Sequence, residues 1–252
     1  MRSRYPTASN FSYSFGPGPL TPAIKVLLAI NVVAFVATQD FIAPGLKLIF
    51  GLNPQAVIGQ LRIWQPVTYM FLHEGFFHIL FNMLTLWMFG VELERMWGTR
   101  FFVKYYFVAG VGAAATTILL SFVPGWFGNQ LYYSLTIGAS GAIYGILLAY
   151  ALYFPNRPIY MYMVFPIPAK YFVMIMGAIS LLSAMGPGNG VAHATHLGGL
   201  VAGFLFLKGG RPNFNFMSEI QYRYLKWKIN RMRRKFDVYS GGRADDVNRR
   251  VH

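Results

Sequence analysis

A serine and four histidines occur in an apolar chain, where polar side chains are costly and are candidates for function. Ser140 stands in the sequence GASG at 138–141, where an uncharged stretch turns into an apolar segment. A serine at this place is either the N-cap of a helix or a nucleophile. In the second case the free N–H groups at the helix start would stabilise an oxyanion, and Gly138 would let a substrate approach the backbone closely.

His196 is the histidine whose spacing suits a serine nucleophile. His196, Gly199 and Gly203 are spaced by three and then four residues, which predicts one stripe of a helix. A Gly-x-x-x-Gly pair also follows Ser140, and small faces of this kind allow close helix packing in lipid. Packing alone would explain the glycines. The same stripe would also carry His196 towards Ser140, and a hydrogen-bonded Ser–His pair is an activated nucleophile.

The other polar residues fit supporting roles around such a pair. His78 and Asn82 are four residues apart, so they share a helix face. They are either polar contacts between helices or donors to an oxyanion. Tyr144, one turn after Ser140, either packs or stacks on the imidazole. His193 is predicted to lie one turn nearer the outside than His196, in contact with water.

Composition places these residues in a membrane protein. Of 252 residues, 55% are hydrophobic and only 12% are charged, whereas soluble domains have about 25% charged residues. The absence of cysteine excludes disulfides, thiol nucleophiles and Cys-ligated metals. Twelve of the 22 Lys and Arg residues lie from Lys208 onward. An almost uncharged body with a basic end indicates an integral membrane protein with a cytoplasmic tail.

Six apolar segments are candidate membrane spans, since a bilayer is crossed by about 20 apolar helical residues. They cover about residues 22–38, 76–91, 101–123, 141–154, 171–185 and 192–207. None of them contains Asp or Glu, so a dyad is expected rather than a triad with an acidic member. We therefore predict an all-α polytopic membrane protein with a cytoplasmic segment 1–21, a six-helix membrane domain 22–207 and a basic tail 208–252.

The charges of the loops predict the orientation. Arg95, Arg100 and Lys104 lie between the second and third spans, and Arg157 and Lys170 lie between the fourth and fifth. The loops at 124–138 and 186–191 carry no charge. Because cytoplasmic loops are rich in Lys and Arg, both termini are predicted to be cytoplasmic. The long first loop, 40–75, is then external, and its apolar residues indicate that it lies in the membrane interface.

The length of the fourth span predicts that the candidate residues share one depth. Fourteen residues of helix measure about 21 Å, which is less than the bilayer core of about 30 Å. Ser140 would then lie below the outer surface. His196 enters the sixth span about five residues from its outer end, or about 7 Å deep. The two side chains are therefore expected at similar depth.

The chain resembles the rhomboid family of intramembrane serine proteases, bacterial six-helix type, over about residues 22–207. The motifs are HILFN at 78–82, Gly90-x3-Glu94-x3-Gly98, GASG at 138–141 with Tyr144, and His196-x2-Gly199-x3-Gly203. The resemblance implies that Ser140 is the nucleophile and His196 the general base. It also implies an oxyanion hole of Asn82, His78 and the Ser140 backbone N–H. Many members have Trp-Arg in the first loop, whereas here Gln65 follows Trp64.

Two other function classes stay open beside the protease. Intramembrane histidines also mark ion pathways, so a metal transporter lined by His73, His78, His193 and His196 is one alternative. His73-Glu74 begins an H-E-x-x-H motif, but the next histidine comes at i+5, off the helix face. The other alternative is a catalytically inactive membrane-binding relative. For the protease we expect no metal and no other cofactor.

The basic tail and the position of the site indicate the partners. Tyr222, Leu225, Ile229, Met232 and Phe236 form an apolar helical stripe among basic residues. This pattern predicts a helix on the anionic inner leaflet and not a nucleic-acid site. The substrates expected are transmembrane segments of other proteins, cut near their outer ends where helix-breaking residues help. The location expected is a bacterial inner membrane.

Overall fold

The computed structural model describes residues 16–40, 42–161, 165–184 and 190–210, together with Leu225, Lys228 and Ile229. The contacts divide the chain into two units, Met1–Leu207 and Lys208–His252, and the first unit holds the candidate residues. In the tail, Leu225 and Ile229 are helical and exposed. The rest of the predicted amphipathic stripe lies outside the described residues.

Helices occur at all six segments that the sequence predicts. They are α1 (Pro22–Ala37), α5 (Phe76–Trp97), α6 (Thr99–Leu120), α8 (Ser140–Tyr153), α9 (Ala169–Ala184) and α10 (Gly190–Gly210). Within the described part of the chain, α5, α6 and residues 191–209 of α10 are long and apolar enough to cross a membrane. The helices α1, α8 and α9 are apolar but have only 14 to 16 residues. A count of six membrane-crossing helices therefore stays a prediction.

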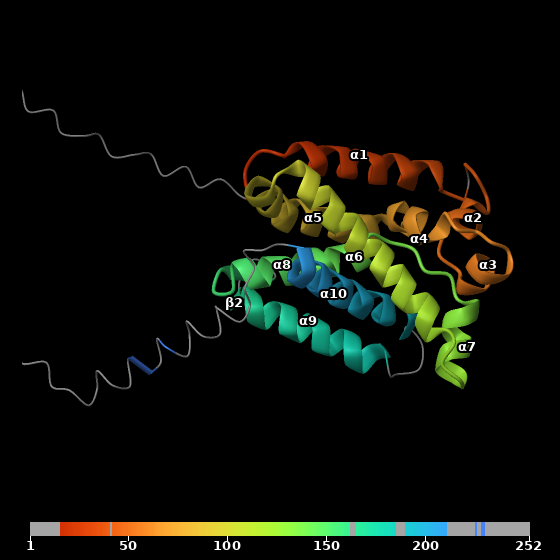
Figure 1. Ribbon diagram of the computed structural model, residues 1–252. Helices are drawn as coiled ribbons and strands as arrows, with labels where there is room; N and C mark the ends of the chain where they lie inside the picture. The colour runs from red at the N-terminus through yellow and green to blue at the C-terminus, as the bar shows by residue number, and fades with distance from the viewer. Residues whose placement is uncertain are drawn as a thin grey trace, which may run out of the picture. The chain divides into compact units, whose positions relative to one another are not determined.

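The first loop folds into short helices, of which α4 (Gln65–Thr68) packs on α6 and α3 (Pro54–Gly59) on the later loop helix (Figure 1). The others are α2 (Leu46–Phe50) and the 3-10 turn η1 (Tyr69–Phe71). Several large apolar side chains of this loop are exposed, among them Ile49, Leu61, Ile63 and Trp64. Such exposure is unusual in water and is expected in a membrane interface. The later loop between α6 and α8 contains α7 (Trp126–Tyr133).

One element departs from the all-α prediction. Strands β1 (Pro158–Met161) and β2 (Phe165–Pro168) form an antiparallel hairpin between α8 and α9, with Pro158 opposite Pro168. The prolines in this stretch favour an irregular loop, since proline cannot donate to a strand ladder. A ribbon of two strands consists only of edges, so its prolines are tolerated. The described part of the chain is otherwise mostly helical, and this hairpin is an addition to the predicted all-α fold.

The helix α8 lies at the centre of the first unit, with α5, α6, α9 and α10 around it (Figure 1). Ten of its 14 residues are buried, compared with ten of 22 in α5. A short, apolar helix that is enclosed by other helices needs no polar face. This position lets α8 hold a side chain at its first residue within reach of several neighbouring helices.

A buried carboxylate joins helices near the end of α5, away from His78 and Asn82. Glu94, near the end of α5, accepts hydrogen bonds from the backbone N–H groups of Ala23 at 2.9 Å and Ile24 at 3.1 Å. It also accepts from the hydroxyls of Thr21 and Thr99. These donors stand at the starts of α1 and α6, where helix N–H groups lack partners within the helix. One side chain therefore joins three helices.

Candidate active site

Ser140 is the first residue of α8, and its hydroxyl points to α10. The N-cap position belongs to Ala139, and no side chain caps the helix, so the interpretation of Ser140 as an N-cap serine was wrong. Its Oγ lies 2.8 Å from Nε2 of His196. That distance is a hydrogen bond, and it places the two side chains at one depth in the bundle.

Backbone contact between two helices brings His196 to this place. A Cβ atom on Gly199 would lie 1.9 Å from the carbonyl oxygen of Gly141, and one on Gly203 would lie 3.2 Å from Cα of Gly145. Only glycine permits such an approach. The prediction that the stripe of His196, Gly199 and Gly203 faces α8 is confirmed.

The ring of His196 is held flat against a tyrosine. The rings of Tyr144 and His196 are stacked, with centroids 4.2 Å apart and an interplanar angle of 7°. The Tyr144 hydroxyl accepts a hydrogen bond of 3.1 Å from Ser180 on α9. Ser180 is fully buried and was missed in the sequence, although a hydroxyl within an apolar segment is the signal that could have found it.

A role as a base for Ser140 would require one particular tautomer of His196. Because Nε2 is the atom that faces the Ser140 hydroxyl, a neutral imidazole that accepts this proton carries its own proton on Nδ1. That Nδ1 is buried and has no hydrogen-bond partner among the described residues. The ring is instead in contact with the stacked Tyr144 and with the edge of His193.

His193 lies beside His196 but makes no contact with the serine. The two rings meet edge to face, with centroids 5.8 Å apart. His193 is half-buried, and its Nδ1 is shielded and has no partner among the described residues. The expectation that His193 is in contact with water was wrong for this atom.

The loop before Ser140 is extended and fits closely around His78. Gly138 has a φ of +127°, and a Cβ there would lie 2.8 Å from Nε2 of His78. The position therefore needs glycine both for its conformation and for space. The Gly138 N–H donates to the carbonyl of Tyr69 at 2.9 Å. This hydrogen bond fixes the position of the loop.

His78 of α5 borders this loop, and Asn82 follows His78 by one helical turn. The backbone N–H of Glu74 lies 3.4 Å from Nδ1 of His78, so in the neutral ring the proton is on Nε2, the atom beside Gly138. Asn82 is buried and donates one amide N–H to the carbonyl of His78 at 2.8 Å. An amide has two N–H donors, so one remains for another acceptor.

His73 is completely buried behind His78, with ring centroids 5.0 Å apart. Burial, and secondarily the neighbouring His78, lower the pKa of His73 to about 4. This ring is therefore neutral at physiological pH. In the part of the chain that the structure describes, no three His, Asp or Glu side chains are grouped so that they could hold a metal ion.

Comparison with known proteins places this chain in a family. Residues 60–211 match the model of the Rhomboid domain. The chain is 30% identical over 216 residues to Rhomboid protease AarA of Providencia stuartii, covering 78% of this chain and 74% of that protein.

Two further relatives are matched over smaller shares of their length. The chain is 32% identical over 157 residues to Rhomboid protease GluP of Bacillus subtilis, covering 62% of this chain and 27% of the relative. It is 29% identical to Rhomboid protease GlpG of Serratia proteamaculans, covering 75% and 61%. With a domain match over more than half of its length and apolar helices that can span a bilayer, this chain belongs to the rhomboid family of membrane proteins.

Proposed function

We propose that this protein is an intramembrane serine endopeptidase that uses a dyad of Ser140 and His196. The observation that carries the proposal is the 2.8 Å contact between Ser140 Oγ and His196 Nε2 at the start of the central helix α8. Relatives named as rhomboid proteases support the same activity. A hydroxyl paired with a neutral imidazole can be deprotonated as it attacks a carbonyl.

The proposed reaction has two stages. Ser140 Oγ attacks the scissile carbonyl while His196 Nε2 takes its proton, and His196 then gives that proton to the leaving amine. The resulting acyl-enzyme is hydrolysed by water, which His196 deprotonates in turn; the proton returns to Ser140 as the carboxylic acid leaves.

The negative oxygen formed in each stage needs hydrogen-bond donors. In this proposal three groups supply them: the backbone N–H of Ser140 at the start of α8, the Nε2–H of His78 and the second amide N–H of Asn82. The closeness of His78 Nε2 to Gly138 supports this assignment. Gly138 has no side chain that would keep a substrate from the backbone, and Tyr144 orients the imidazole of His196, the proposed base.

The proposed substrates are transmembrane segments of other proteins, which reach the site within the bilayer. The distribution of basic residues supports cytoplasmic termini and an external first loop. The relatives in Providencia, Bacillus and Serratia support placement in a bacterial inner membrane. Basic residues of the tail would then face anionic lipid headgroups.

The test is cleavage of a model transmembrane substrate by purified protein in lipid vesicles. We expect the parent protein to cut the substrate and to be labelled by a fluorophosphonate, a reagent for activated serines. Ser140→Ala should lose both properties while keeping the thermal transition of the parent. Cleavage by the Ser140→Ala protein would exclude this serine as the nucleophile.

A further inference from the structure

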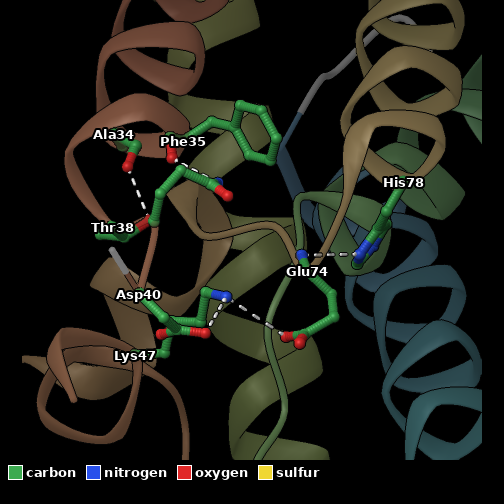
Figure 2. Close-up of polar contacts among 8 residues, drawn as sticks. Ala34, Phe35, Thr38, Asp40, Lys47, Glu74 and His78 are labelled. Carbon is green, nitrogen blue, oxygen red and sulfur yellow. Dashed lines mark hydrogen bonds and ion pairs between the residues drawn. The ribbon is translucent and has the colours of Figure 1, made fainter. Parts of the chain in front are cut away.

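A cluster of three charged residues lies at the outer end of the bundle, next to His78. The Lys47 ammonium lies 3.4 Å from a carboxylate oxygen of Asp40 and 3.8 Å from one of Glu74. Figure 2 shows Lys47 between these two carboxylates, with Glu74 at the turn that leads to His78. The three residues come from the loop after α1, from α2 and from the turn before α5.

Lys47 is the buried member of this cluster. Its side chain is only 10% exposed, whereas those of Asp40 and Glu74 are 70% and 72% exposed. A buried ammonium is costly unless an opposite charge accompanies it. The two carboxylates supply the opposite charge that this buried ammonium needs.

The same residue that pairs with Lys47 contacts His78 through its backbone. The Glu74 N–H lies 3.4 Å from Nδ1 of His78, as the dashed line in Figure 2 shows. Gly75 follows Glu74 in this turn. A Cβ atom at Gly75 would meet nothing within 4 Å, so the turn is not packed against neighbouring side chains at this residue. The side chain of Glu74 supplies a restraint through its pairing with Lys47.

The segment that carries Lys47 also holds the loop of the nucleophile. Leu52, just after α2, exchanges two backbone hydrogen bonds with Thr136, at 2.9 and 2.8 Å. Asn53 donates to the carbonyl of Ser134 at 3.0 Å. One short stretch of the first loop thus contacts both the turn before His78 and the strand-like segment before Ser140.

From this arrangement we propose that Lys47 and Glu74 are positioning residues for His78. Their ion pair fixes the Glu74 peptide, whose N–H keeps the proton of His78 on Nε2 and aims that N–H at the space beside Gly138 and Ser140. The proposal rests on the proposed function, in which His78 stabilises the oxyanion. Neither residue touches the substrate in this account; both act through His78.

The test measures kcat and KM for cleavage of one transmembrane substrate in vesicles. Lys47→Met and Glu74→Gln should each lower kcat by about tenfold with little change in KM, since an oxyanion donor acts in the transition state. Lys47→Arg should restore most of the rate because it keeps the charge. Lys25→Met removes a lysine from an exposed position of α1 and should leave kcat unchanged.

A double-variant experiment separates positioning from general support of the fold. In a His78→Ala background, Lys47→Met and Glu74→Gln should cause no further loss of kcat, because the residue they position is gone. Losses that multiply in this background, or that follow a fall in thermal stability, would overturn the proposal. If Lys47→Met does not fold, Glu74→Gln decides by the same criteria, since its side chain is mostly exposed.

The parent protein and Ser140→Ala are measured in the same series. If the parent shows no cleavage that depends on Ser140, both the proposed function and this inference fail. If the parent cleaves normally and Lys47→Met and Glu74→Gln keep the parent kcat, the inference alone fails.

Discussion

The backbone of Gly199 lies so close to the carbonyl oxygen of Gly141 that a methyl group on Gly199 would come within 1.9 Å of that oxygen. The two residues join α10 to α8 beside the Ser140–His196 pair, since Gly141 follows Ser140 directly and Gly199 lies about one helical turn after His196. The distance between helix axes at this level is therefore set by atoms that cannot move aside without moving a helix. The geometry of the Ser140–His196 pair depends on this contact.

Gly199→Ala should separate α8 from α10 and weaken the bond between Ser140 and His196. We expect cleavage to fall at least about 100-fold, as misplacement of a reacting group by about 1 Å can cause, and the thermal transition to fall. Gly177→Ala on α9 is the control, because its Cβ would make only an ordinary contact of 3.5 Å with Leu200. If Gly199→Ala and Gly177→Ala cleave the substrate at the same rate, the close contact between Gly199 and Gly141 is contradicted.

Asn82→Ala tests whether this amide acts on the oxyanion. We expect kcat to fall roughly 10²- to 10³-fold with little change in KM. Thr85→Ala is the control, because the Thr85 hydroxyl also bonds the carbonyl four residues earlier, at 2.7 Å, but is exposed. If Asn82→Ala keeps its kcat and loses only thermal stability, Asn82 is a packing residue.

Glu94 should be essential for stability and not for chemistry. It is 2% exposed and accepts four hydrogen bonds, so Glu94→Ala leaves buried donors unpaired. Bonds to a charged group contribute about 1.5–3 kcal/mol each, and we expect a loss of at least about 3 kcal/mol.

Glu92→Ala is the comparison for Glu94, measured by thermal unfolding in detergent. The pair of Glu92 with Arg157 is partly exposed, and such pairs contribute about 0–1 kcal/mol. If Glu94→Ala lowers the stability by as little as Glu92→Ala does, the bonds at the starts of α1 and α6 do not stabilise the bundle.

The helices and the contacts made by the loops differ in how well the sequence predicts them. Apolar length locates the helices, and the spacing of His196, Gly199 and Gly203 identifies the face of α10 that packs on α8. The partners of Glu94 and Lys47 follow from the paths of loops, and no periodic pattern encodes them. Glu94 bonds residues more than 70 positions away, which local spacing cannot indicate.

The candidate site likewise combines residues that the sequence predicts with supporting contacts that it does not. The types and order of Ser140, His196, His78 and Asn82 allow a site to be predicted from motifs. The bond from Ser180 to Tyr144 and the pairing of Leu52 with Thr136 connect segments that have no sequence pattern in common. Supporting contacts of this kind arise only once the chain is folded.

Low pH should destabilise the protein through His73. Its pKa is about 4 in the folded protein and about 6.5 when unfolded, so the unfolded chain binds the proton more readily. Stability is therefore full above about pH 6.5 and falls as the pH drops towards 4. Between pH 7 and pH 5 the loss from this residue is about 2 kcal/mol.

His73→Leu removes the titrating group and keeps an apolar side chain. The decrease in thermal stability from pH 7 to pH 5 should be smaller in this variant than in the parent. Effects of pH that involve neither His73 nor its neighbour His78 are common to both proteins and cancel in the comparison. An identical decrease in the two proteins would mean that His73 is protonated equally in the folded and unfolded states.

The two histidines of α10 distinguish a dyad from a metal site. Only His196 contacts Ser140, while His193 meets the edge of the His196 ring at 5.8 Å. For a dyad, His196→Ala should abolish cleavage and His193→Ala should keep most of it. For a metal site, each change removes a ligand, so both variants should lose activity equally. Measuring one transmembrane substrate with both variants, with and without a chelator, separates the two. Equal losses together with inhibition by the chelator would replace the dyad by a metal, because a Ser–His pair has no step that a chelator can block.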